Sequence, residues 1–294
     1  MAFPDAIVMG FGKMPADCAS VLLQNEVAIR GILETEKAGF SGLAGFAERA
    51  GIPFAAPARD EITHRLSLVD KPTVVFSINN NYIFPRDVCG RENLRIVNFH
   101  NSLLPHYRGH GRVIPSWVVF AGEARHGVTW HLVSADVDGG NILCQGGFEV
   151  SEDDTALQVM MRAVSLGIRL FARHWQEFMD PEYKGRPQGE ARGRIFGKND
   201  VPNRGEMDLS WDFKTAGRFL RSMDYGVFRL LPLPRIRLDG KWYVVRKYRI
   251  ESRGNRFSKG GVQVVERPEG KAGDAAILYP EGIIRLSIAE EKTR

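Results

Sequence analysis

The first 180 residues alternate short, β-branched apolar runs with segments of helical character, and this alternation constrains the fold more than any other feature. Six apolar runs predict strands, at residues 6–10, 27–33, 74–78, 95–99, 127–134 and 141–150. Helices are expected at 16–23, 41–50 and, with near-helical spacing of apolar residues, 155–179. Strands that alternate with helices form βαβ units, so we predict an α/β domain with a mostly parallel sheet.

The pattern changes between residues 180 and 204, where glycine and proline interrupt every period. Such a stretch is typical of a linker or a long surface connection. Beyond it we expect an amphipathic helix at 211–224 and short strands at 236–238, 241–245, 262–265 and 282–286. Short strands separated by glycines favour a small β-barrel or sandwich. The expected organisation is a first domain at 1–190, a linker at 191–210 and a helix-plus-barrel domain at 211–294.

Composition and cysteine content narrow the class of protein. The chain has 294 residues, 44% of them hydrophobic and 26% charged, which is typical of a globular protein. It has no run of about 18 apolar residues, and Met1–Asp5 lacks the features of a signal peptide. The three cysteines are widely spaced, without a C-x-x-C pair. This argues against a disulfide framework and a thiolate-rich zinc site, and favours a cytoplasmic protein.

The net charge is unevenly distributed. The chain carries 40 Lys and Arg residues against 35 Asp and Glu residues, a formal net charge of +5. Residues 191–294 hold 22 basic and 13 acidic residues, whereas residues 1–190 hold 18 basic and 22 acidic ones. The basic excess of the last third favours an anionic partner such as RNA, a phosphorylated substrate or an acidic carrier. For each single basic side chain, a solvated surface position is an equally good explanation.

A glycine turn follows the first predicted strand and reads Gly10-Phe11-Gly12-Lys13-Met14-Pro15. A dinucleotide-binding fingerprint would have a third glycine where Pro15 stands. Proline is favourable in the first turn of a helix. We therefore expect a tight turn that enters a helix, and no NAD.

The segment 96–143 contains the residues best suited to catalysis. Asn98 and His100 lie two apart at the carboxyl end of a predicted strand, so their side chains point to the same side. Ligands of open α/β sheets bind beyond these strand ends, and Asp138 lies in a glycine-rich turn after the next strand. Acyl transfer to an amine requires three groups: an amide that donates to a carbonyl oxygen, an imidazole that titrates near neutral pH and an orienting carboxylate.

Each of these residues alone is more often structural, and Asp-Gly-Gly is commonly just a turn. The combination is more specific, because it follows the pattern N-x-H-x-S-L-L-P, G-V-T-x-H and D-x-G at residues 98–105, 127–131 and 138–140. Over residues 5–180 the chain resembles the folate-dependent formyltransferases. These include methionyl-tRNA formyltransferase, glycinamide ribonucleotide transformylase, the sugar N-formyltransferases and the formyltransferase domains of peptide synthetases.

The resemblance implies a Rossmann-like formyltransferase domain followed by a small β-rich, OB-like barrel domain. It implies an enzyme that uses 10-formyltetrahydrofolate as co-substrate. We expect no metal, and no covalent enzyme intermediate because no serine or cysteine is paired with a base in the motif. Asn98, His100 and Asp138 match the catalytic triad of the family. The pterin would lie against the loop 77–85 and the turn 137–139, mainly on backbone groups, so the expected cofactor-binding residues are Asn80, Asn81, Tyr82, Ile83, Val137 and Gly139.

The acceptor is less constrained by the sequence. The loop 106–115 departs from the R-G-x-x-P pattern of enzymes that act on tRNA, and Met223-Asp224-Tyr225-Gly226 resembles formyltransferases of secondary metabolism. We expect a small-molecule amine or hydroxylamine, such as an amino acid, hydroxyornithine or an amino sugar, free or linked to a carrier or nucleotide. The basic tail suits a phosphate-bearing acceptor, and it suits methionyl-tRNA equally well, which is the first alternative.

Two further alternatives are a formyltetrahydrofolate hydrolase and a folate-binding regulator without turnover; the intact triad argues against the regulator. We expect no membrane partner, and the sequence leaves the oligomeric state open. Five histidines, at 100, 106, 110, 126 and 131, also allow a structural metal. This interpretation is weak, because no H-E-x-x-H occurs and residues 106–112 are too rich in glycine to form a helix. His131, beside Trp130 on a strand, is expected to be a core or supporting residue.

Overall fold

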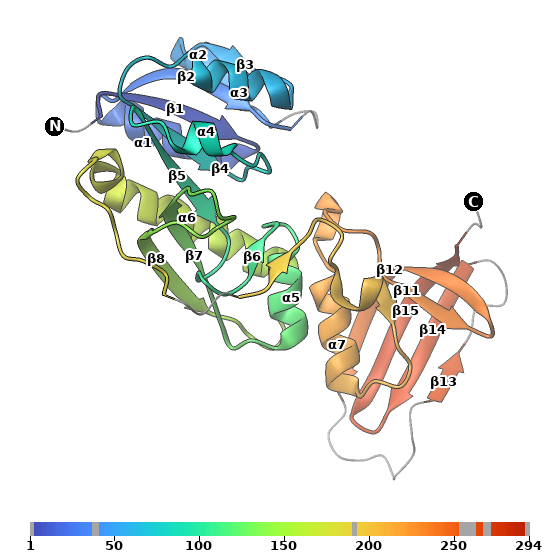
Figure 1. Cartoon of the computed structure of the whole chain (residues 1–294). Helices are drawn as coiled ribbons and strands as arrows, with labels where there is room; N and C mark the ends of the chain where they lie inside the picture. Colours follow the sequence, from blue (N-terminus) through green and yellow to red (C-terminus); the bar gives the residue numbers. More distant parts are fainter. Residues whose placement is uncertain (1–2, 37–40, 190–192, 253–262, 267–271, 292–294) are drawn as a thin grey trace. The chain divides into compact units, whose positions relative to one another are not determined.

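A computed structural model describes residues 3–36, 41–189, 193–252, 263–266 and 272–291 of the chain (Figure 1). The chain divides into two compact units. Unit 1 comprises the described parts of 1–111, 126–148 and 161–196, and unit 2 those of 112–125, 149–160 and 197–294. Each unit is therefore assembled from several stretches of chain. Residues 191–192 of the predicted linker and Val262 of a predicted strand lie outside the described residues.

Unit 1 is built on a seven-stranded sheet with the order β3-β2-β1-β4-β5-β7-β8 (Figure 1). Its strands are β1 (Asp5–Gly10), β2 (Ala28–Glu34), β3 (Phe54–Ala55), β4 (Thr73–Ile78), β5 (Leu94–His100), β7 (Arg125–Leu132) and β8 (Ile142–Glu149). The first five strands of this order pair in parallel, and β7 joins β5 antiparallel. The predicted α/β fold with a mostly parallel sheet is confirmed.

Helices cover the sheet of unit 1, and buried strand residues alternate between two cores. The helices are α1 (Lys13–Gln24), α2 (Leu43–Ala50), α3 (Arg59–Ser67), α4 (Arg86–Cys89) and α6 (Ala156–Met179), of which α6 contributes its residues from Met161 onward. Val74 and Phe76 of β4 belong to the core that includes α1 and α6, whereas Val75 packs with α3 and α4. Successive side chains of a strand point to opposite faces, so β4 is buried on both sides.

The glycine turn after β1 has a structural explanation. A Cβ atom on Gly10 would lie 1.8 Å from the carbonyl oxygen of Ile78, at the end of the neighbouring strand β4. Gly10 also has a φ of +154°. Because only glycine allows this close approach of two backbones, Gly10 is required by the packing of β1 against β4.

Unit 1 also contains a two-stranded parallel sheet made of β6 (Arg108–Gly109) and β9 (Ile195–Phe196). Neither strand was predicted. β9 lies in the segment that the glycine and proline pattern marks as a connection, and β6 lies in the loop after Pro105. Residues of the connection therefore pair with the loop that follows β5.

Unit 2 contains helices α5 (Ile114–Ala121) and α7 (Phe213–Ser222), two short 3-10 helices, η1 (Pro202–Gly205) and η2 (Gly226–Phe228), and a six-stranded sheet. In sheet order the strands are β10 (Glu206–Met207), β11 (Arg235–Leu238), β12 (Lys241–Ser252), β15 (Gly282–Glu290), β14 (Ala272–Tyr279) and β13 (Gln263–Glu266). The ring of Phe219 on α7 lies 6.2 Å from Phe120 on α5 and 5.2 Å from Trp211. The predicted helix and the β-rich character of this region are confirmed.

The longest helix begins at a capping box in unit 2. The amide of Thr155 donates to Oε1 of Gln158 at 2.8 Å, and the amide of Gln158 donates back to Oγ1 of Thr155 at 3.3 Å. These two bonds satisfy amides that a helix start would otherwise leave without partners, which explains the predicted start of the helix at Asp154-Thr155. Within the part of the chain that the structure describes, no helix is both long and apolar enough to cross a membrane.

Candidate active site

Three polar residues form a row across neighbouring strands of unit 1. The strand register pairs Ser77 of β4 with Asn98 of β5, and Asn98 with His131 of β7. Oγ of Ser77 donates to Oδ1 of Asn98 at 2.7 Å, and Nδ2 of Asn98 lies 3.1 Å from Nε2 of His131. Asn80 extends the row, because its Nδ2 donates to Oγ of Ser77 at 3.0 Å.

The contacts of His131 define the orientation of the Asn98 amide. Nδ1 of His131 lies 2.8 Å from the carbonyl oxygen of Leu132. A carbonyl oxygen only accepts, so Nδ1 carries the hydrogen and, in the neutral ring, Nε2 is an acceptor. Nδ2 of Asn98 therefore donates to Nε2 of His131, while Oδ1 accepts from Ser77. One of the two N–H bonds of this amide remains available to a ligand.

His100 is 4% exposed, and each of its ring nitrogens faces an oxygen atom of the site. Its Nε2 lies 2.8 Å from the carbonyl oxygen of Tyr107, and its Nδ1 lies 3.5 Å from Oδ1 of Asp138. The carbonyl contact requires a hydrogen on Nε2, so Nδ1 is the nitrogen that can accept a proton. Burial lowers the pKa of His100, and the nearby Asp138 carboxylate and Tyr107 carbonyl only partly oppose this. The ring is therefore neutral near pH 7.

Asp138 is the carboxylate of the site, and its backbone has a φ of +50°. Its Oδ2 accepts a hydrogen bond from the Gly109 amide at 2.7 Å, and its Oδ1 lies 3.6 Å from Nε2 of His131. Burial alone would raise the pKa of Asp138. The interactions with His100 and His131 and the bond from Gly109 outweigh burial, so this pKa lies well below its usual range. The carboxylate is ionised at neutral pH.

The structure brings Asn98, His100 and Asp138 to one end of the sheet. Asn98 and His100 come from the end of β5, and Asp138 comes from the loop between β7 and β8. The arrangement presents an amide N–H, a neutral imidazole nitrogen and an ionised carboxylate. Together these groups can stabilise a developing oxyanion and accept a proton.

Two of the residues predicted to bind the cofactor turn their side chains into the protein. Oδ1 of Asn80 accepts from the amide of Tyr82 at 2.9 Å. The Tyr82 ring is buried, and its hydroxyl lies 2.6 Å from Oγ1 of Thr63. Ile83 differs, because its side chain is 58% exposed. At this loop a ligand would thus meet the Ile83 side chain and backbone groups.

The other predicted cofactor-binding residues are held mainly through backbone atoms. The carbonyl of Val137 accepts from the Arg108 guanidinium, with Nε at 3.0 Å. The amide of Gly139 donates to the carbonyl of Asp136 at 3.0 Å. Asn81 donates from its side chain to Oε1 of Glu36. The contacts of the turn 137–139 therefore hold its shape.

Four residues of the site were not predicted from the sequence. Ser77 is the first residue of the predicted pterin loop 77–85, and Arg108 and Gly109 lie in the loop 106–115, which departs from the family pattern. Gln188, whose Nε2 donates to the carbonyl oxygen of Asp138 at 2.7 Å, belongs to no motif in the sequence. His131 was expected to be a core or supporting residue, and its contact with Asn98 is consistent with support.

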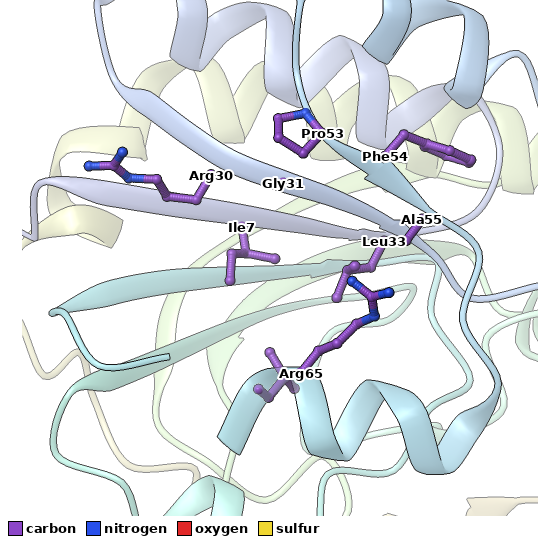
Figure 2. Close-up of a pocket in the computed structure, with 9 residues that line it drawn as sticks. Ile7, Arg30, Gly31, Leu33, Pro53, Phe54, Ala55 and Arg65 are labelled. Atoms are coloured by element: carbon purple, nitrogen blue, oxygen red, sulfur yellow. The ribbon is translucent and has the colours of Figure 1, made fainter. Parts of the chain in front are cut away.

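No metal site marks this region in the part of the chain that the structure describes. In the described ranges, no three His, Cys, Asp or Glu side chains are placed to hold a metal ion. A cavity of about 170 Å³ lies elsewhere in unit 1, between β1, β2, β3 and α3 (Figure 2). It is lined by residues such as Gly31, Phe54 and Arg65, and includes none of the predicted site residues.

Comparisons with known proteins identify sequences and structures that are similar to this chain. The profile of the formyl transferase family matches residues 47–174. GDP-perosamine N-formyltransferase of Brucella melitensis biotype 1 is 29% identical over 245 residues, which cover 81% of this chain and 91% of that protein.

Solved structures show the same fold. The N-formyltransferase of Helicobacter canadensis, in complex with folinic acid and dTDP-3-aminofucose, aligns with a TM-score of 0.73 and 17% identity, over 97% of this chain and 99% of that chain. WlaRD, a sugar 3N-formyl transferase solved with dTDP and 5-N-formyl-THF, aligns with a TM-score of 0.72 and 18% identity, over 100% of both chains. Residues 47–174 of the chain therefore match the formyl transferase family, in agreement with the resemblance that its motifs predicted.

Proposed function

We propose that this chain transfers the formyl group of 10-formyltetrahydrofolate to the amine of a nucleotide-linked amino sugar. The observation that carries the proposal is the grouping of Asn98, His100 and Asp138 in a chain that aligns along 81% of its length with a GDP-perosamine N-formyltransferase. The acceptors named for two similar proteins, GDP-perosamine and dTDP-3-aminofucose, are both amino sugars linked to a nucleoside diphosphate. The basic excess of residues 191–294 suits the diphosphate of such an acceptor.

The residues at the proposed folate site are compatible with a pterin. The side chains of Asn80 and Tyr82 are engaged inside the protein, which leaves backbone amides and carbonyls of this loop and the exposed Ile83 side chain for a ligand. A flat heterocycle with donors and acceptors along its edge can use such backbone groups, as small-molecule sites commonly do. Asn98, with one N–H available, lies at the end of the adjacent strand.

Each side chain of the triad has a distinct role in the proposed reaction. When bound, 10-formyltetrahydrofolate supplies an activated formyl carbon. The attacking amine forms the new C–N bond, and the bond to the folate nitrogen breaks. The available N–H of Asn98 stabilises the formyl oxygen as it gains negative charge. Nδ1 of His100 accepts the proton that the amine loses, and Asp138 stabilises the imidazolium that results. The imidazolium then gives this proton to the folate nitrogen as tetrahydrofolate leaves, which restores the neutral ring.

The test is release of tetrahydrofolate from 10-formyltetrahydrofolate by the purified chain. We expect release with a GDP-linked or dTDP-linked amino sugar, together with a formylated sugar detected by mass spectrometry. The same assay is run with charged initiator tRNA, with amino acids and hydroxyornithine, and without an acceptor. His100→Ala protein serves as the control for contaminating activity.

Each result separates one alternative from the proposal. Release that requires tRNA would assign the chain to methionyl-tRNA formylation, and acceptor-independent release would identify a hydrolase. Release of tetrahydrofolate only with amino acids or hydroxyornithine would support formyl transfer but refute an amino sugar as the acceptor. A sugar transferase should also lose little acceptor affinity between 50 and 200 mM salt, whereas binding to tRNA falls steeply over roughly that range.

A further inference from the structure

The connection after α6 runs along the loops that carry the site. The carbonyl of Lys184 accepts from Nδ2 of Asn141 at 3.0 Å. Arg186 and Ile142 exchange two backbone hydrogen bonds, of 2.8 and 2.9 Å. These bonds attach the connection to the chain just beyond the turn that contains Asp138. We call residues 184–189 and 193–196 the strap.

Gln188 is the strap residue that touches the Asp138 turn. Its Nε2 donates to the carbonyl oxygens of Asp138 and Gly140, each at 2.7 Å. The two N–H groups of the Gln188 side-chain amide thus donate to two carbonyls, one on each side of Gly139. Asp138 has a φ of +50°, a conformation that a residue other than glycine keeps only where its surroundings hold it.

The second part of the strap holds the loop after β5. The amide of Gly193 donates to the Pro105 carbonyl at 3.0 Å, and the amide of Arg108 donates to the Arg194 carbonyl at 3.0 Å. The ring of Phe196 stacks on Tyr107 at 5.6 Å.

This loop supplies two backbone groups to the site. They are the Tyr107 carbonyl at Nε2 of His100 and the Gly109 amide at Oδ2 of Asp138. The space beside Gly109 is closed by the strap, because a Cβ there would lie 2.3 Å from the Phe196 carbonyl oxygen. The strap therefore contacts both loops that orient the proposed base and carboxylate.

We propose that the strap positions Asp138 against His100, and that Gln188 is a positioning residue for the formyl transfer. The inference rests on the proposed function. Gln188 touches neither reacting group in this arrangement; it acts through the backbone of Asp138. The Arg108 guanidinium holds the preceding carbonyl, that of Val137, so the turn is held on both sides of Asp138.

The test replaces Gln188 by methionine, which keeps most of its bulk and removes both donors. We expect kcat to fall about tenfold to a hundredfold, with the KM values for donor and acceptor near those of the wild type, because a small misplacement of a reacting group has effects of this size. Gln176→Met is the matched control, since Gln176 lies on the exposed surface of α6. Gln188→Ala is the second variant, in case the methionine side chain distorts the turn.

A second readout does not depend on knowing the acceptor. The titration of the His100 ring is followed by NMR in the full chain, with its signal assigned by its loss in His100→Gln protein. Charged or titratable groups that interact with His100 include Asp138, His131, Arg108 and His126. Of these, the Asp138 carboxylate raises the pKa of His100. A displaced Asp138 should therefore lower that pKa in Gln188→Met and in Gln188→Ala but not in Gln176→Met.

The two readouts separate this inference from the proposed function. A lowered pKa of His100 in both Gln188 variants supports positioning even where no acceptor yields activity. An unchanged titration in folded Gln188 variants, checked by circular dichroism and thermal unfolding, overturns it. A fall in kcat without a shift of the pH profile would also overturn it, because general destabilisation lowers the rate equally at every pH.

Discussion

Nδ2 of Asn98 lies 3.1 Å from Nε2 of His131, and the register of β5 and β7 places the two residues directly opposite each other. The hydrogen on Nδ1 of His131 makes Nε2 an acceptor. Oδ1 and one N–H of the Asn98 amide are therefore hydrogen-bonded within the protein, and the other N–H is available to a ligand. The orientation of this amide, the proposed oxyanion donor, follows from strand register together with one histidine tautomer.

Asn98→Ala should remove the oxyanion donor and lower kcat by about a hundredfold or more. The effect should fall on kcat rather than on KM for the donor, because the amide bond to the formyl oxygen strengthens as charge develops. Steady-state kinetics of tetrahydrofolate release measure it. A variant that keeps near-normal transfer would show that another group carries this role.

His131→Ala should lower kcat by about tenfold, because the Asn98 amide loses the acceptor that orients it and one N–H is left without a buried partner. His131→Gln provides the matched comparison, since Oε1 of glutamine can accept the same bond. We expect the glutamine variant to recover part of the lost rate. Equal rates for the two variants would contradict an orienting role.

Asp138→Asn should lower kcat by about a hundredfold and move the acidic limb of the rate profile to lower pH. His100 must be neutral to accept a proton, so that limb lies at the pKa of His100. The Asp138 carboxylate raises this pKa, and its neutralisation lets burial lower the pKa further. The profile of kcat against pH checks the direction, and a shift to higher pH would refute the assigned pairing.

The strands could be predicted from the sequence because their signals are local, and the triad stays a prediction drawn from the same local patterns. Residues 74–78 and 95–99 are mainly apolar, interrupted only by Ser77, Arg95 and Asn98, and Asn98 and His100 share a face through the two-residue period of a strand. The sequence pattern does not predict α3, for a physical reason. Only Ile62 and Leu66 of its nine residues are buried, which is too few to produce an apolar period.

The strap could not be predicted, because its contacts join residues far apart in the chain. Gln188 bonds to the carbonyl of Asp138, 50 residues earlier, and β9 pairs with β6 over two residues. Glycine and proline in this segment indicate a loop but not what the loop touches. Local pattern thus identifies reactive side chains more readily than the backbone groups that position them.

Unfolding free energy should fall as the pH is lowered through the range of His126. Burial lowers the pKa of this histidine to about 3, whereas in the unfolded chain it is about 6.5. Between these values the unfolded state binds the proton and the folded state does not, so stability falls with decreasing pH, by at most about 1.4 kcal/mol per unit from this residue. His126→Gln keeps a donor for Oδ1 of Asn101 and should show a shallower slope. Urea denaturation between about pH 4.5 and 7 measures the difference, and parallel slopes would contradict it.

Two glycine-to-alanine substitutions in helices should change stability in opposite directions. At Gly167 of α6, a Cβ would lie 2.4 Å from a ring carbon of the buried Phe99, so Gly167→Ala should destabilise the fold by about 1–3 kcal/mol through overpacking. At Gly45 of α2, the nearest atom is the end of the flexible Arg49 side chain at 3.3 Å. Gly45→Ala should therefore stabilise by up to about 1 kcal/mol, the ordinary helix preference for alanine. Both variants carry the same substitution, and chemical denaturation measures the free energy of unfolding of each. Stabilisation by Gly167→Ala would show that the contact between α6 and β5 yields more readily than its packing indicates.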